Sequence, residues 1–135
     1  MSPDGQTDFV SSRRRWTGRV ISGIAVLFLI FDGTIHIAKP APVVEAFAQM
    51  GFPLSTSVGI GLLELACLSI YVIPRSAVFG AVLLTGYLGG AIAAQVRVGS
   101  PLFSTVLFPV YVAVLVWGGL YLRDRRLGAL LAATD

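Results

Sequence analysis

Residues 20–38 read VISGIAVLFLIFDGTIHIA, an almost unbroken apolar stretch that is long enough to cross a lipid bilayer as one helix. A spanning helix needs about 20 predominantly apolar residues. Three further stretches of this kind follow, at residues 58–73, 76–96 and 102–122. The first of these three is short, and residues just before it extend the span to about 57–73. The sequence therefore predicts an all-α membrane protein with four transmembrane helices.

The composition also indicates that the bilayer is the solvent. The 135 residues are 56% hydrophobic and only 13% charged, whereas soluble domains carry about 25% charged residues. This shortage of charge argues against a soluble enzyme, a disordered tail and a nucleic-acid-binding module. The single cysteine, Cys67, excludes an internal disulfide, a C-x-x-C redox pair and a thiolate zinc site.

Positive charge is concentrated on one side of the predicted bundle. Eight of the ten Lys and Arg residues precede the first span, follow the fourth, or lie between the second and third, namely Arg13, Arg14, Arg15, Arg19, Arg75, Arg123, Arg125 and Arg126. Only Lys39 and Arg97 fall on the other side. An excess of Lys and Arg marks the cytoplasmic side, so we expect both termini in the cytoplasm. An even number of spans requires the same arrangement.

The chain then divides into a basic cytoplasmic segment (1–19), a membrane domain (20–122) and a cytoplasmic tail (123–135). Short connections between spans two, three and four predict antiparallel neighbours in a four-helix bundle. The first outer connection is longer, and Val43, Phe47 and Met50 share one helical face within it. We expect a short amphipathic helix at residues 42–50, which covers the outer end of the bundle or forms a lid over a site.

Charged residues lie inside two of the spans. Asp32, His36 and Lys39 follow one another at i, i+4 and i+7 in the first span, so they share a face. Glu64 lies in the second span. A charge at membrane depth costs about 2.5–3.5 kcal/mol on insertion scales, so such residues normally face the bundle interior and have partners.

Depth predicts which of these residues meet. Asp32 and Glu64 each lie six residues from the outer end of their span, which is about 9 Å at 1.5 Å per residue. Gln95 and Arg97 end the third span on the same side. We therefore expect one ligand-binding or proton-handling cluster, made of Asp32, His36, Lys39, Glu64, Gln95 and Arg97.

The cluster has a functional and a structural interpretation. Two neighbouring carboxylates in a low dielectric do not both ionise cheaply, so one is expected to be protonated or to pair with a Lys, Arg or His of the cluster. The structural alternative is a salt-bridge network that fixes helix register. A metal could take Asp32, His36 and Glu64 as ligands. With only one His in the chain, and with Asp–His at i, i+4 a common helix contact, the sequence alone predicts no metal.

Small residues line one face of the third span. Gly86, Gly90 and Ala94 form a small-x-x-x-small series, and Gly89 flanks it. Small residues let helix backbones approach closely in lipid. We expect Gly86, Gly89 and Gly90 to pack against another helix of the chain, with homodimerisation as the alternative. In the fourth span, Pro109 predicts a kink near the depth of the two carboxylates.

Several segments, taken together, carry a family resemblance. They are Asp32 and Lys39, the turn GFP at 51–53, GIGLLEL at 59–65, LTGYLGGAIA at 84–93, VR at 96–97, WGGL at 117–120 and LRD at 122–124. They resemble the DoxX-like family of small bacterial four-span membrane proteins over most of the chain from about Asp32 onward. The resemblance implies a multi-pass protein of the bacterial cytoplasmic (inner) membrane. Relatives often carry His where this chain has Gln95, and a glutamine cannot titrate near neutral pH.

Three functions fit these features. Some distant relatives are subunits of quinone-linked sulfur oxidation or terminal oxidase systems, so the resemblance implies an accessory subunit or small-ligand binder in membrane redox metabolism. A quinone head group would lie against Asp32, Glu64 and Arg97, and electron transfer would need a membrane or periplasmic redox partner. The alternatives are a proton-coupled transporter of a small metabolite and a non-catalytic assembly factor. No nucleophile–base–orienter set is visible, which argues against a stand-alone enzyme.

Overall fold

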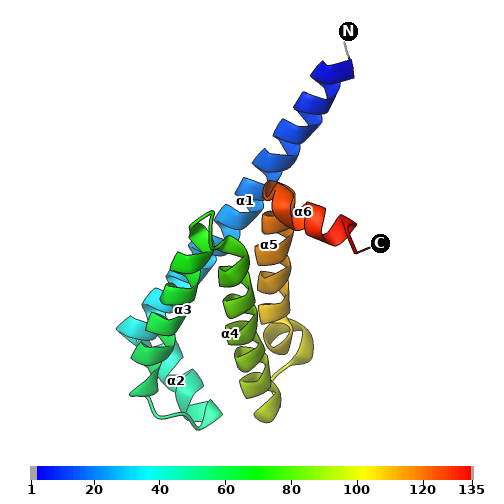
Figure 1. The fold of residues 1–135 in the computed structure, drawn as a ribbon. Helices are drawn as coiled ribbons and strands as arrows, with labels where there is room; N and C mark the ends of the chain where they lie inside the picture. Colours follow the sequence, from blue (N-terminus) through cyan, green and yellow to red (C-terminus); the bar gives the residue numbers. More distant parts are fainter. Residues whose placement is uncertain (1–2, 135) are drawn as a thin grey trace.

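The computed structural model of the chain describes residues 3–134. These residues form helices, with no strand among them, as the sequence predicts (Figure 1). The elements are α1 (Pro3–Ala38), α2 (Ala41–Met50), α3 (Thr56–Val72), α4 (Ala77–Arg97), the π-helical turn η1 (Leu102–Val106), α5 (Phe108–Arg123) and α6 (Arg125–Ala132).

Three helical segments are long and apolar enough to cross a membrane, namely Ser11–Ala38, Ala77–Arg97 and Leu102–Arg123. Helix α3, at 17 residues, rises about 25 Å at 1.5 Å per residue, slightly less than the hydrocarbon thickness of about 30 Å. A helical membrane protein is therefore supported. The count of four spans and the orientation of the termini stay predictions.

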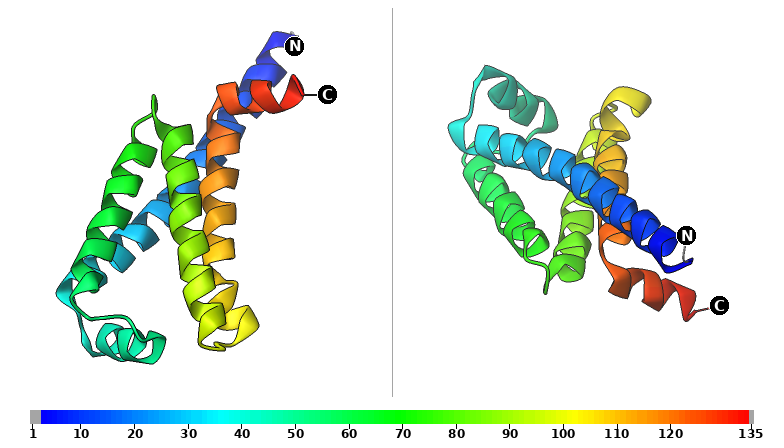
Figure 2. Two further views of the ribbon diagram at one scale, coloured as in Figure 1. Left: turned by 60° about the horizontal axis from the view of Figure 1, so that its bottom comes forward. Right: turned by 90° about the horizontal axis from the view of Figure 1, so that it is seen from above.

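Four helices form the bundle. Helix α1 contacts both α3 and α5, and α4 contacts the same two helices. Helix α2 lies across one end of the bundle, which we call the α2 end. Helix α6 lies toward the opposite end, which we call the α6 end, and α1 extends beyond the other helices there (Figures 1 and 2). Helices α3 and α4 meet near the α6 end and diverge toward the α2 end (Figures 1 and 2).

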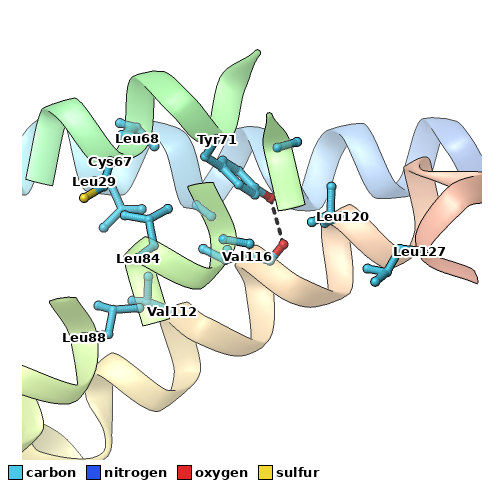
Figure 3. Packing of buried hydrophobic residues seen from close by; sticks show 13 residues of the cluster. Leu29, Cys67, Leu68, Tyr71, Leu84, Leu88, Val112, Val116, Leu120 and Leu127 are labelled. Carbon is cyan, nitrogen blue, oxygen red and sulfur yellow. Dashed lines mark hydrogen bonds between the residues drawn. The ribbon is translucent and has the colours of Figure 1, made fainter. Parts of the chain in front are cut away.

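A buried hydrogen-bond network ties three helices together toward the α6 end. The Tyr71 hydroxyl on α3 donates to the Val116 carbonyl on α5 at 2.8 Å (Figure 3). Because its only proton is used there, it accepts from the Ser22 hydroxyl on α1, 3.1 Å away. Ser22 Oγ in turn accepts from Arg123 Nε at 3.0 Å. The network lies beside buried apolar residues that include Leu84 and Leu120.

Close helix approaches occur at glycines, two of which face a glycine of the neighbouring helix: Gly61 faces Gly33, and Gly119 faces Gly18. A Cβ on Gly61 of α3 would lie 2.6 Å from the Gly33 carbonyl oxygen of α1. A Cβ on Gly80 of α4 would collide with the Tyr71 backbone, and one on Gly119 of α5 with Ser22. These three glycines therefore set the α1–α3, α3–α4 and α1–α5 spacings, as small residues do in membrane helices.

The glycine stripe of α4 does not make such contacts. A Cβ at Gly86, Gly89 or Gly90 would meet no described atom within 4 Å outside its own helix. The prediction that these glycines pack closely against another helix of the chain is therefore wrong. The physical reason is the divergence of α3 and α4, which leaves these three glycine positions without an atom of another helix nearby, although Tyr87 still reaches Glu64 of α3.

A glycine ends the amphipathic helix α2, and a proline lies in the first turn of α5. The short helix expected at residues 42–50 is present as α2, with Val43 and Phe47 buried. It ends at Gly51, whose φ of 71° is in the left-handed region that glycine adopts readily. Pro109 does not kink a continuous helix as predicted. It lies in the first turn of α5, where a missing N–H costs nothing, after the π-helical turn η1.

Candidate functional site

A cavity of about 780 Å³ lies where α3 and α4 diverge, and α1, α2, η1 and α5 complete its wall. This volume is within the range of about 300–1,000 Å³ that is usual for small-molecule pockets. Apolar side chains form most of the wall, among them Phe28 and Phe108, whose ring centroids are 5.1 Å apart. Gly86 and Gly90 also line it, and their missing side chains add to its volume.

Four of the six residues predicted to cluster line this cavity: Asp32, His36, Glu64 and Gln95. Asp32 and His36 come from α1, Glu64 from α3 and Gln95 from α4. The depth argument therefore places together residues from three helices. Gln95 takes part through its amide, whose Oε1 accepts a 2.6 Å hydrogen bond from Ser100.

The two cations of the predicted cluster lie outside it. Lys39 and Arg97 are exposed, do not line the cavity and form no ion pair with the residues that the structure describes. Helix α1 ends at Ala38, and Lys39 has a φ of 53°, so the chain turns away at this point. Arg97 is the last residue of α4. Of the alternatives expected for the carboxylates, pairing with Lys39 or Arg97 does not occur among the described residues.

Glu64 is the most deeply buried polar group of the cavity, with 0% of its surface exposed. Its Oε2 accepts a 3.0 Å hydrogen bond from the Tyr87 hydroxyl of α4. Its Oε1 is buried and has no hydrogen-bond partner within the described part of the chain. A buried acceptor without a partner costs about 1–3 kcal/mol, so this atom marks a place where a donor or a cation would be stabilised.

Asp32 and His36 interact within one turn of α1. His36 Nδ1 lies 2.8 Å from the Asp32 carbonyl oxygen and 3.5 Å from the Asp32 carboxylate. A carbonyl oxygen only accepts, so Nδ1 carries a proton, and in the neutral ring Nε2 keeps the lone pair. Of the pairings predicted between a carboxylate and a Lys, Arg or His of the cluster, the described residues contain the contact of Asp32 with His36, which is an ion pair only when the ring is protonated.

Tyr87 belongs to the site but was not among the predicted residues. The spacing from Gln95 could have assigned Tyr87 to the site, because residues 87, 91 and 95 lie at i, i+4 and i+8 and so share a helical face. All three line the cavity. A tyrosine among small residues in a membrane helix brings a hydroxyl that needs a partner, and Glu64 supplies it.

Helix α2 covers the cavity at its wide end. The Phe47 ring packs edge-on against His36 with centroids 5.9 Å apart, and Phe52 lies 6.3 Å from Phe47. On the other side, Met50 Sδ lies 3.8 Å from Gln95 Nε2. Helix α2 therefore connects the α1 wall to the α4 wall, which fits the predicted lid.

Comparison with known protein families identifies the family of this chain. The family model described as DoxX-like family matches residues 20–119. The chain belongs to the DoxX-like family. The segment shared with the DoxX-like family contains every polar cavity residue described above, from Asp32 to Gln95. No curated protein and no solved structure shows a significant match.

Proposed function

We propose that this DoxX-like protein is an accessory component of membrane redox metabolism that holds a small amphipathic ligand, with a quinone as the candidate. The observation that carries the proposal is the cavity itself. Its walls are mostly apolar, and hydrogen-bonding side chains from α1, α3 and α4 are interspersed among them. Few polar groups in an apolar pocket orient a ligand that has an apolar body and a polar head.

A quinone or quinol fits this pattern of chemistry. The aromatic side chains Phe28 and Phe108 offer a surface for its ring. Asp32, His36 and Glu64 offer hydrogen-bonding groups for the oxygens of its head. Arg97, which was expected to contact the head group, lies outside the cavity and is left out of the proposal. Electrons would pass to or from a separate redox partner.

Charge supports an orientation in which the cavity is in the outer half of the membrane. Arg123 ends α5, and Arg125 and Arg126 begin α6, at the end opposite α2. Lys39 and Arg97 are at the α2 end, where α1 and α4 finish. Because the side richer in Lys and Arg usually faces the cytoplasm, we propose that the α6 end is cytoplasmic and that the α2 end faces the outside of the bacterial inner membrane.

Filling the cavity tests the proposal. Gly86→Leu and Gly90→Leu add side chains into the cavity, whereas Gly89 has equal free space but does not line it. Gly89→Leu is therefore the matched control. Each variant, reconstituted in nanodiscs, is incubated with a short-chain quinol, and bound quinol is measured by native mass spectrometry.

We expect the wild type and Gly89→Leu to bind quinol, and Gly86→Leu and Gly90→Leu to lose binding while they stay folded. Equal binding by all four proteins would contradict the proposal. Proton-dependent uptake of a metabolite into proteoliposomes, without quinol binding, would instead support a transporter.

A further inference from the structure

The cavity contains two carboxylates and, among the described residues, no Lys or Arg side chain in its wall. His36 Nδ1 lies 3.5 Å from the Asp32 carboxylate, a contact that becomes an ion pair only when the imidazole is protonated. Burying an ionised carboxylate without a compensating charge is strongly unfavourable. Lys39 and Arg97 are exposed and lie outside the cavity, so neither contributes positive charge to its wall.

Three side chains bring metal-ligating atoms close together at this place. One oxygen each of Asp32 and Glu64 and one ring nitrogen of His36 all lie within 4.8 Å of one another. Ligands bound at about 2.1 Å in a tetrahedral site lie roughly 3.4 Å apart. Small side-chain rotations would therefore bring the three groups around one ion.

The groups next to these side chains are those that support metal ligands. A ligating histidine almost always donates its other N–H to a carbonyl or carboxylate. His36 Nδ1 donates to the Asp32 carbonyl, so in the inferred site Nε2 is the nitrogen that would bind the ion. A ligating carboxylate is in turn hydrogen-bonded, and Tyr87 holds Glu64 Oε2. Glu64 Oε1 is buried and has no hydrogen-bond partner in the described chain, so its lone pairs are free to bind a metal ion.

From this arrangement we infer that Asp32, His36 and Glu64 form a binding site for a divalent transition-metal ion inside the cavity. One nitrogen and two carboxylate oxygens suit borderline ions such as Zn²⁺, Mn²⁺ and Fe²⁺. Two carboxylates and a neutral imidazole balance the charge of such an ion. Sequence reasoning discounted a metal because the chain has one histidine, and the structure adds the convergence of the three side chains and their supporting hydrogen bonds.

The ion would leave at least one coordination position for a further ligand. Open positions of this kind take water or an oxygen of a small molecule. Binding of the ion does not depend on the proposed quinone function. If both hold, the head group of the amphipathic ligand would occupy the open position.

The test measures metal binding without any quinone. The full chain in nanodiscs is stripped with a chelator and dialysed against Zn²⁺ or Co²⁺, and bound metal is counted by elemental mass spectrometry. The variants are Asp32→Asn, His36→Gln and Glu64→Gln. The matched control is Glu45→Gln on α2, since Glu45 is exposed and does not line the cavity.

We expect one ion per chain in the wild type and in Glu45→Gln, and loss of saturable binding in the three site variants. Tyr87→Phe, which removes the bond that orients Glu64, should weaken affinity roughly 10–100-fold without abolishing binding. Bound Co²⁺ should give a visible absorption band that is absent in Glu64→Gln. Circular dichroism identifies any variant that fails to fold. If Glu64→Gln does not fold, metal binding by Asp32→Asn still tests the inference, because Asp32 is only partly buried.

A wild type without saturable metal binding would overturn the inference, as would unchanged binding in folded Asp32→Asn and Glu64→Gln. Either result leaves the quinol experiment intact, because that experiment uses the glycine variants and a different ligand. Saturable metal binding in the wild type together with equal quinol binding by all four glycine proteins would support the metal site and contradict the quinone proposal.

Discussion

The Tyr87 hydroxyl of α4 donates a 3.0 Å hydrogen bond to Oε2 of Glu64 on α3, and both residues line the cavity. The bond connects two helices in the region where their backbones diverge. It holds one oxygen of a fully buried carboxylate and leaves the other without a partner in the described chain. This bond and the contacts around it have measurable consequences for stability and binding.

Removing the hydroxyl in Tyr87→Phe should destabilise the protein by about 1–3 kcal/mol, because both oxygens of Glu64 are then buried without a donor. Thermal unfolding in nanodiscs measures the effect. The control is Tyr111→Phe, since the Tyr111 hydroxyl also makes one bond, to the Phe103 carbonyl, but at an exposed position. Equal stability of the two variants would mean that the Glu64 contact contributes little.

Glycine substitutions in α4 should have opposite effects at two positions. Gly80→Ala places a Cβ against the Tyr71 backbone, so we expect a loss of about 1–3 kcal/mol from overpacking, or failure to fold. Gly86→Ala places its Cβ in open space and gains helix propensity worth up to about 1 kcal/mol. Unfolding temperatures of both variants decide the matter, and the reverse order would show that the α4 stripe, not Gly80, is the packed face.

The network at the α6 end should behave as one unit. Ser22→Ala removes the hydroxyl that bonds both Tyr71 and Arg123, and Tyr71→Phe removes the bond to the Val116 carbonyl. Each should cost about 1–2 kcal/mol, and the double variant should cost less than the sum, because the two share a bond.

The control for this network is Ser69→Ala, whose hydroxyl bonds only a carbonyl one turn earlier at an exposed position. It should change stability little. Strict additivity of Ser22→Ala and Tyr71→Phe in chemical unfolding would argue that the hydroxyls act separately.

Topology can be measured directly. Reporter fusions after residue 135 and near residue 1 should both report cytoplasm, and one near Gln49 should report the outside. The reason is the concentration of arginine at the two terminal segments. A cytoplasmic reporter at Gln49 would contradict the four-span arrangement and, with it, the placement of the cavity in the outer half.

Sequence was sufficient for the features that depend on position along a helix. The apolar length requirement of a bilayer located the helices, and equal depth from the helix ends brought Asp32 and Glu64 into one cavity. Depth contains no information on the path of the chain beyond a helix end. The chain turns at Lys39, and Arg97 closes α4, so both cations are exposed although they lie on the same side of the membrane as the cluster was expected to.

The glycines show a second limit. A stripe of glycines indicates that another helix could come close to the backbone, but it does not show that a helix lies there; Gly86, Gly89 and Gly90 are such a stripe. The close contacts fall at five other glycines, and the stripe at 86–90 faces free space; the five are Gly18, Gly33, Gly61, Gly80 and Gly119. Only the spatial paths of α3 and α4 distinguish the two cases.

Helices α3 and α4 are joined by the short connection at 73–76, and Gly80 rests on the Tyr71 backbone beside that joint. A pair of rods fixed at one end separates most at the other, so any widening of the cavity is greatest beneath α2. Toward the joint, the Tyr71 and Leu120 side chains are fully buried, each at 0% exposure. In a single copy of this chain the cavity is therefore widest at the end opposite the joint, and we expect a bound molecule to enter and leave near α2.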